Sequence, residues 1–176
     1  MAWSTPLTAV ANTMLTAGQW NASVRDNLKE SEAAVASRSS RILVTDGANR
    51  LAERDILDHI IDDQETTTAT SYGDLTPVGP VVTITTGTLA LTWLNGQVQN
   101  TASTNTFMSV ALSGATTVAA SDAWALECDG GAGQANRLCV HRLQSCNPGV
   151  NVFTTKYRVS GGTGTFYKRR LIVMGL

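Results

Sequence analysis

Apolar and polar residues follow a helical spacing near the beginning of this chain and an alternating, strand-like spacing after about residue 70. Residues 1–15 have neither spacing and predict an extended arm. Thr16, followed three residues later by Gln19, has the capping-box arrangement that starts helices. Apolar side chains then recur every four residues at Trp20, Val24 and Leu28. A helix this short needs a partner, either copies of itself or a platform protein.

The second half of the chain predicts seven strands separated by turn residues. The breaks between them include Gly79-Pro80, Asn95-Gly96, Asn147-Pro148-Gly149 and Gly161-Gly162. This spacing predicts a mainly β fold, an antiparallel β-sandwich or jelly roll, preceded by the arm and one short α-helix. By analogy of fold class, the length and strand pattern of this region fit trimeric heads of the tumour-necrosis-factor-like or C1q-like type. The predicted strands are Val81–Thr86, Leu89–Leu94, Thr106–Leu112, Ala123–Cys128, Leu138–Leu143, Val150–Val159 and Phe166–Met174.

The change in pattern predicts three regions. Residues 1–36 form an anchoring arm and helix, residues 37–69 a neck, and residues 70–176 a β-sandwich head. Within the neck, the turn signal Asp46-Gly47 predicts a short hairpin between residues 41 and 56. An acidic stretch from Asp58 to Glu65 follows it.

Charge is distributed unevenly along the 176 residues. The net charge is -1, and no Lys or Arg occurs between Arg54 and Arg137. Such a chain lacks the basic excess of a nucleic-acid binder. We expect no secretory signal, because the N-terminus has neither a basic segment nor a continuous apolar run. We also expect no membrane span, because no apolar run approaches about 20 residues. Synthesis in a host cytoplasm is therefore expected, with the three cysteines, Cys128, Cys139 and Cys146, as free thiols.

The candidate catalytic and metal-binding side chains do not form a known pattern. There is no Gly-x-Ser-x-Gly motif, and the two histidines, His59 and His141, lie far apart in the sequence. A glycosidase would need paired carboxylates, for which the cluster Asp122, Glu127 and Asp129 beside Trp124 is the available set. Turn and capping roles explain these carboxylates more simply. The three cysteines and His141 lack a Cys-x-x-Cys pair. We expect no catalytic residue, cofactor or metal.

A basic cluster, Lys168-Arg169-Arg170, lies in the last predicted strand. Strand alternation sends Lys168 and Arg170 to one face and Arg169 to the other. We expect these side chains to face water or the acidic neck of the same or a neighbouring subunit, with an acidic virion surface as an alternative.

Both ends of the chain carry specific patterns. The first is Trp3-Ser4-Thr5-Pro6, then Thr16-Ala17-Gly18-Gln19-Trp20-Asn21 and Val24-Arg25-Asp26-Asn27-Leu28; the second is Phe153–Val159 with Gly161–Phe166 and Arg169-Arg170. Together they resemble small structural proteins of tailed bacteriophages of actinobacteria, of the head-decoration, minor-tail and tail-fibre types. The resemblance implies a non-enzymatic protein on the exterior of the virion. The anchoring residues would be Trp3, Pro6, Trp20, Asn21, Val24, Arg25 and Leu28.

Three functions remain open at this point. One anchor, one neck and one head, without a long fibrous shaft, favour a head decoration or short spike that is bound to the major capsid protein or another platform. A tail-fibre or minor-tail protein attaching to the host surface is the alternative. A carbohydrate-binding module would use Trp93, Trp124 or Tyr167 against a host-surface glycan. A β-domain of this size with apolar strands at both ends also predicts a homotrimer.

Overall fold

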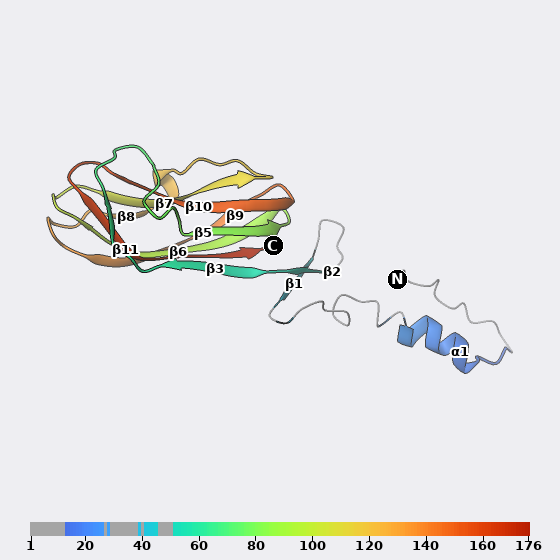
Figure 1. Ribbon diagram of the computed structural model, residues 1–176. Coiled ribbons are helices and arrows are strands. Elements are labelled where there is room, and N and C mark those ends of the chain that lie inside the picture. The colour runs from blue at the N-terminus through green and yellow to red at the C-terminus, as the bar shows by residue number, and fades with distance from the viewer. Residues whose placement is uncertain (1–12, 27, 29–38, 40, 46–50) are drawn as a thin grey trace. The chain divides into compact units, whose positions relative to one another are not determined.

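The computed structural model describes residues 13–26, 28, 39, 41–45 and 51–176 (Figure 1). The chain divides into two compact units, residues 1–53 and residues 54–176. The predicted regions 1–36, 37–69 and 70–176 remain a prediction. In the described residues, no helix is both long enough and apolar enough to cross a membrane.

The first unit contains a helical segment and a small sheet. Helix α1, Ala17–Trp20, starts with the predicted capping box: the Gln19 amide donates to Thr16 Oγ1, and the Thr16 amide donates to Gln19 Oε1. A π-helix, η1, continues it over Asn21–Asp26. This departs from the regular α-helix that was predicted, because π-helical bonds span five residues and break the four-residue spacing of Trp20 and Val24.

The predicted short hairpin is confirmed as a two-stranded sheet of β1, Ile42–Thr45, and β2, Leu51–Arg54. Its Asp46-Gly47 turn lies outside the described residues. The Arg41 guanidinium donates to the Glu53 carbonyl at 3.2 Å. The sheet is therefore supported by side chains as well as by the backbone.

The second unit is a jelly roll of two antiparallel sheets packed as two layers (Figure 1). One sheet, called here the β3 sheet, has the order β3-β11-β6-β9, with β4 also paired to β11; the other, the β5 sheet, has the order β5-β10-β7-β8. The strands are β3 Ile56–Ile61, β4 Glu65–Thr67, β5 Val81–Thr86, β6 Leu89–Asn100, β7 Thr106–Gly114, β8 Leu126–Cys128, β9 Asn136–Ser145, β10 Gly149–Val159 and β11 Gly164–Gly175, with a 3-10 helix η2, Asp122–Trp124. The mainly β, antiparallel prediction is confirmed.

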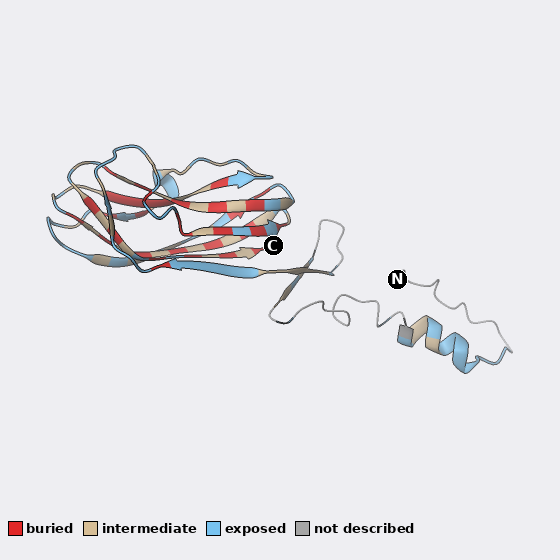
Figure 2. Cartoon of the chain, in the orientation of Figure 1, coloured by how far each residue is buried: buried red, intermediate tan, exposed pale blue. Residues whose placement is uncertain are grey.

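Alternation along the strands places the core between the sheets, where Figure 2 shows the buried positions. On β6, Ala90, Leu94 and Val98 point inward and are buried. Tyr157 of β10 and Phe166 of β11 meet edge to face across the layers, with ring centroids 4.8 Å apart. This geometry is the favoured one for aromatic pairs.

The interpretation of Asn95-Gly96 as a turn between strands was wrong. Asn95-Gly96 is not a break but lies within β6, which runs on to Asn100. Gly96 faces the other sheet, where an added Cβ would lie 2.6 Å from Met108 Cε. The glycine thus permits close packing between sheets rather than a turn. His59, in the predicted neck, lies in β3, where its Nδ1 accepts a hydrogen bond from the Val81 amide at 2.9 Å.

Candidate interaction surfaces

The outer surface of the β3 sheet carries seven large apolar side chains, which we call the apolar face. The strand register aligns them in rows across the sheet. Met174 is opposite Ile56 on one side and Leu91 on the other, and Leu91 is opposite Leu143. The members of the apolar face are Ile56, Ile60, Leu91, Trp93, Leu143, Ile172 and Met174.

The two edge strands leave the apolar face most accessible. Leu143 on β9 is 58% exposed, and Ile60 on β3 is 47% exposed. Figure 2 shows β3 as an almost continuously exposed strand. Toward the centre, a hollow of about 390 Å³ is lined by Ile56, Trp93, Asn95, Cys139, Ile172 and Met174. The hollow therefore extends across the sheet from β3 to β9, with Ile60 and Leu143 exposed on the two edge strands.

The charged groups of the apolar face neutralise each other. Arg170 on β11 forms an ion pair with Asp58 on β3, with Nη2 2.8 Å from Oδ2. This confirms the expected contact between the basic cluster and the acidic stretch of the same chain. Lys168, in contrast, is exposed at a bulge where its φ is 50°.

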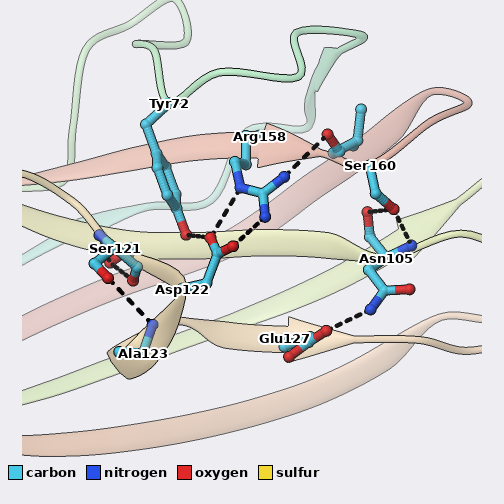
Figure 3. Close-up of polar contacts among 10 residues, drawn as sticks. Tyr72, Asn105, Ser121, Asp122, Ala123, Glu127, Arg158 and Ser160 are labelled. Atoms are coloured by element: carbon cyan, nitrogen blue, oxygen red, sulfur yellow. Dashed lines mark hydrogen bonds and ion pairs between the residues drawn. The ribbon is translucent and has the colours of Figure 1, made fainter.

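The outer surface of the β5 sheet is different, because loops of the same unit cover it. Arg158 on β10 and the hydroxyl of Tyr72 both donate to the carboxylate of Asp122 in η2 (Figure 3). The guanidinium also lies 3.9 Å from the ring centroid of Phe107 on β7. The cluster attaches two loops, one from each side, to the sheet.

Two further contacts stabilise the same surface, and Figure 3 labels Asn105 and Glu127 of the second. The Ser121 amide donates to Ser109 Oγ at 3.2 Å, and the Ser109 hydroxyl donates back to the Ser121 carbonyl at 2.9 Å. Asn105 donates through its side-chain amide to the carboxylate of Glu127. All of these groups are engaged within the fold, which indicates a structural role.

The electrostatics of Asp122 argue against a catalytic acid at this position. Hydrogen bonding from Arg158 lowers the pKa of Asp122, and Tyr72 adds to the effect. Burial, followed by the neighbouring Asp122, raises the pKa of the Tyr72 hydroxyl. Asp122 is therefore ionised and Tyr72 protonated at neutral pH, which is the arrangement of a stable ion-pair cluster.

Arg169 points into the core, where the sequence predicted a solvated or ion-paired side chain. It is fully buried. One guanidinium nitrogen donates to the Asp63 carbonyl at 3.2 Å, and another lies 3.5 Å from the Tyr157 hydroxyl oxygen. Its Nε has no hydrogen-bond partner among the described residues. The prediction that Arg169 faces the opposite side from Lys168 and Arg170 is correct. That side is the interior of the unit, so the guanidinium contacts the Asp63 carbonyl and not water.

The predicted anchoring residues are only partly described. Trp3 and Pro6 lie outside the described residues. Trp20 is 57% exposed and Leu28 is 61% exposed, and Arg25 is also exposed. Asn21 and Val24 are half-buried. Their role in attachment stays a prediction.

The three aromatic side chains considered for carbohydrate binding do not converge. Trp93 lies in the centre of the apolar face, and Tyr167 lies further along the sheet, opposite Gln97. Trp124 is in η2, where the Arg142 guanidinium stacks 3.8 Å from its ring centroid. A sugar platform needs adjacent rings, so this arrangement favours other roles for them.

The thiols and histidines are also dispersed. Cys128 and Cys146 are buried and Cys139 is exposed, all as free cysteines. Asn136 donates to Cys128 Sγ at 3.2 Å. In the described part of the chain, no three metal-ligating side chains lie together.

The apolar face was missed at the sequence level, although a signal existed. Residues 56–61 place apolar side chains at both alternate positions, Ile56 and Ile60 on one side and Leu57 and Ile61 on the other. This is the pattern of a strand that is apolar on two faces. Asp58 and His59 between them obscured this pattern.

Comparison with known proteins gives structural likeness only. No family model and no curated protein matches the chain. The structure of a subviral particle of infectious bursal disease virus VP2 covers 71% of this chain with 16% sequence identity and a TM-score of 0.45. The structure of the Gx strain of the same virus covers 70% of this chain with 15% sequence identity and a TM-score of 0.44. An Eiger TNF from S. frugiperda is 10% identical over 69% of this chain and 92% of its own, with a TM-score of 0.45. The chain spans about a third of the viral proteins, 34% in each case.

Proposed function

We propose that the protein is a non-enzymatic structural component of the exterior of a bacteriophage particle. In this proposal the N-terminal segment attaches it to the virion, and the jelly-roll unit is displayed as a homotrimer. A head decoration or short spike on the major capsid protein is the favoured position. The resemblance of both chain ends to actinobacterial phage proteins supports this assignment.

The observation that carries the attachment role is the exposure of Trp20 and Leu28. Both are large apolar side chains in or directly after the helical segment, and both are more than half exposed. Large aromatics at interfaces contribute about 2 kcal/mol or more each when buried by a partner. A segment that presents them to solvent is suited to docking on another protein.

The engaged side chains of the β5 sheet support a structural role. Asp122, which the sequence offered as half of a carboxylate pair, is held by Arg158 and Tyr72, and Glu127 is held by Asn105. Groups committed to such contacts stabilise loops and are not available to transfer protons to a substrate.

The test is localisation on intact particles of the encoding phage. Cryo-electron microscopy, or an antibody against residues 54–176, should place the protein on the capsid surface. Localisation at the tail would replace the decoration role by the tail-fibre or minor-tail role. Absence from purified particles, with expression confirmed in infected cells, would overturn the virion assignment altogether.

A further inference from the structure

The jelly-roll unit leaves its apolar face uncovered. On the β5 sheet, the Tyr72 side chain contacts Arg158 and Asp122 over β10, and the Ser121 loop contacts Ser109 of β7. On the β3 sheet, Leu143 and Ile60 remain about half exposed. A contiguous exposed apolar surface on one side of a domain marks an interaction site.

The size of the face fits a protein partner. Strands lie about 4.8 Å apart and rise about 3.3 Å per residue, so the 6, 12, 12 and 10 residues of β3, β11, β6 and β9 together cover roughly 630 Å², with the apolar face as part of this surface. Each side of a typical stable protein interface buries about 600–1,000 Å². A small ligand in the central hollow would leave Leu143 and Ile60 at the edges in water.

The charges and shape of the face select a second copy of the chain as the partner. Asp58 and Arg170 already neutralise each other on the face, so an identical surface brings no like-charge repulsion. A two-fold contact between the centres of two apolar faces would place the two hollows opposite each other and leave them unfilled. A head-to-tail contact instead places the exposed Leu143 edge in the hollow beside Trp93 of the next copy.

We propose that the apolar face is the contact surface between copies of this chain, with the β9 edge of each copy in the hollow of the next. Head-to-tail contacts form a closed ring when the rotation between copies closes, and three copies make the smallest such ring. The inference rests on the homotrimer in the proposed function and names the surface that forms it. Cys139 lines the hollow, so the contact covers its thiol.

The experiment compares the full-length chain with Leu143→Asp and with Val150→Asp as a matched control. Val150 is apolar and 55% exposed but lies on β10 in the other sheet. Native mass spectrometry and light scattering at micromolar concentration should give three times the chain mass of 18.6 kDa for the unmodified protein and for Val150→Asp. Leu143→Asp should raise the dissociation constant at least about 30-fold. Circular dichroism checks its folding, and Ile60→Glu on β3 is the second variant from the opposite edge.

Maleimide labelling of Cys139 provides an independent readout. Cys139 should be protected in the unmodified protein and in Val150→Asp, and reactive in Leu143→Asp. A trimer that survives both face substitutions with Cys139 reactive would overturn this surface while keeping the proposed trimer. A monomer with reactive Cys139 would overturn both. A monomer with protected Cys139 would show that residues 1–53 of the same chain cover the face, which also contradicts the inference. Virion localisation is scored separately from all of these outcomes.

Discussion

The guanidinium of Arg169 lies buried beside the ring of Tyr157, with its central carbon 5.5 Å from the ring centroid. The Tyr157 hydroxyl donates to the Gly79 carbonyl at 2.6 Å. Burial raises the pKa of Tyr157, which keeps it protonated as a donor. The pair links β10 and β11 to the segment between β3 and β4, at Asp63, and to the segment between β4 and β5, at Gly79.

Replacing Arg169 with Ala should destabilise the β unit by about 3 kcal/mol, because it opens a cavity and leaves the Asp63 carbonyl without its donor. Chemical denaturation measures the free energy of unfolding. Lys168→Ala, at the exposed neighbouring position, is the control and should change it by less than about 0.5 kcal/mol. Equal losses in the two variants would contradict the structural role of Arg169.

The ion pair between Arg158 and Asp122 should make stability depend on pH. The pKa of Asp122 is lowered in the folded state, so the pair stabilises the fold above the unfolded value of about 3.9. This contribution is lost as pH falls through the lower folded value. The melting temperature of Asp122→Asn should therefore lie below that of the unmodified protein at pH 7, and the gap should close in acid below about pH 4.

The pH series needs a control for the amide substitution itself. Asp129→Asn, at an exposed loop position, should show little difference at any pH. A gap for Asp122→Asn that stays constant from pH 7 to pH 2.5 would mean that the carboxylate charge contributes nothing.

Gly87 should tolerate no side chain. Its amide donates to the Leu176 carbonyl at 2.7 Å, and an added Cβ would lie 2.5 Å from that oxygen. Because the clash involves backbone, Gly87→Ala should cost about 2 kcal/mol. Gly73→Ala is the matched control, since nothing lies within 4 Å of its added Cβ. Thermal unfolding of both variants tests this, and a neutral Gly87→Ala would be the contrary result.

Cys128 and Cys146 should be unreactive in the folded protein and dispensable for it. Both are buried, and burial raises the pKa of the Cys146 thiol, which lowers its thiolate fraction. Alkylation should reach them only after unfolding, and Cys→Ala at each should lower the melting temperature modestly. Rapid native alkylation of either, stoichiometric zinc, or unfolding by a chelator would contradict this.

Deleting residues 1–28 should leave a folded β unit that no longer joins particles. The unit of residues 54–176 contains its own hydrophobic core. Occupancy on purified particles, measured by immunoblot, should fall to background, whereas Trp124→Ala in the β unit should leave it unchanged. Normal occupancy of the truncated protein would remove the anchoring role from Trp20 and Leu28.

Local patterns in the sequence determined most of the secondary structure. Thr16 and Gln19 form the predicted capping box, and Val81–Thr86 is predicted and observed with the same bounds. The capping box involves residues i and i+3, and strand alternation relates residues i and i+2. Both can be predicted from residues that are close in the sequence.

The tertiary structure decided what lies far apart in the chain. Gly96 is a packing position because Met108 of the other sheet faces it, and Arg169 is buried because its side of β11 packs against Tyr157 of the other sheet. The apolar face exists because strand pairing brings Ile56, Trp93 and Leu143 onto one side of one sheet. Each of these depends on register between distant strands, and a shift of one residue would have sent the same side chains to the opposite face.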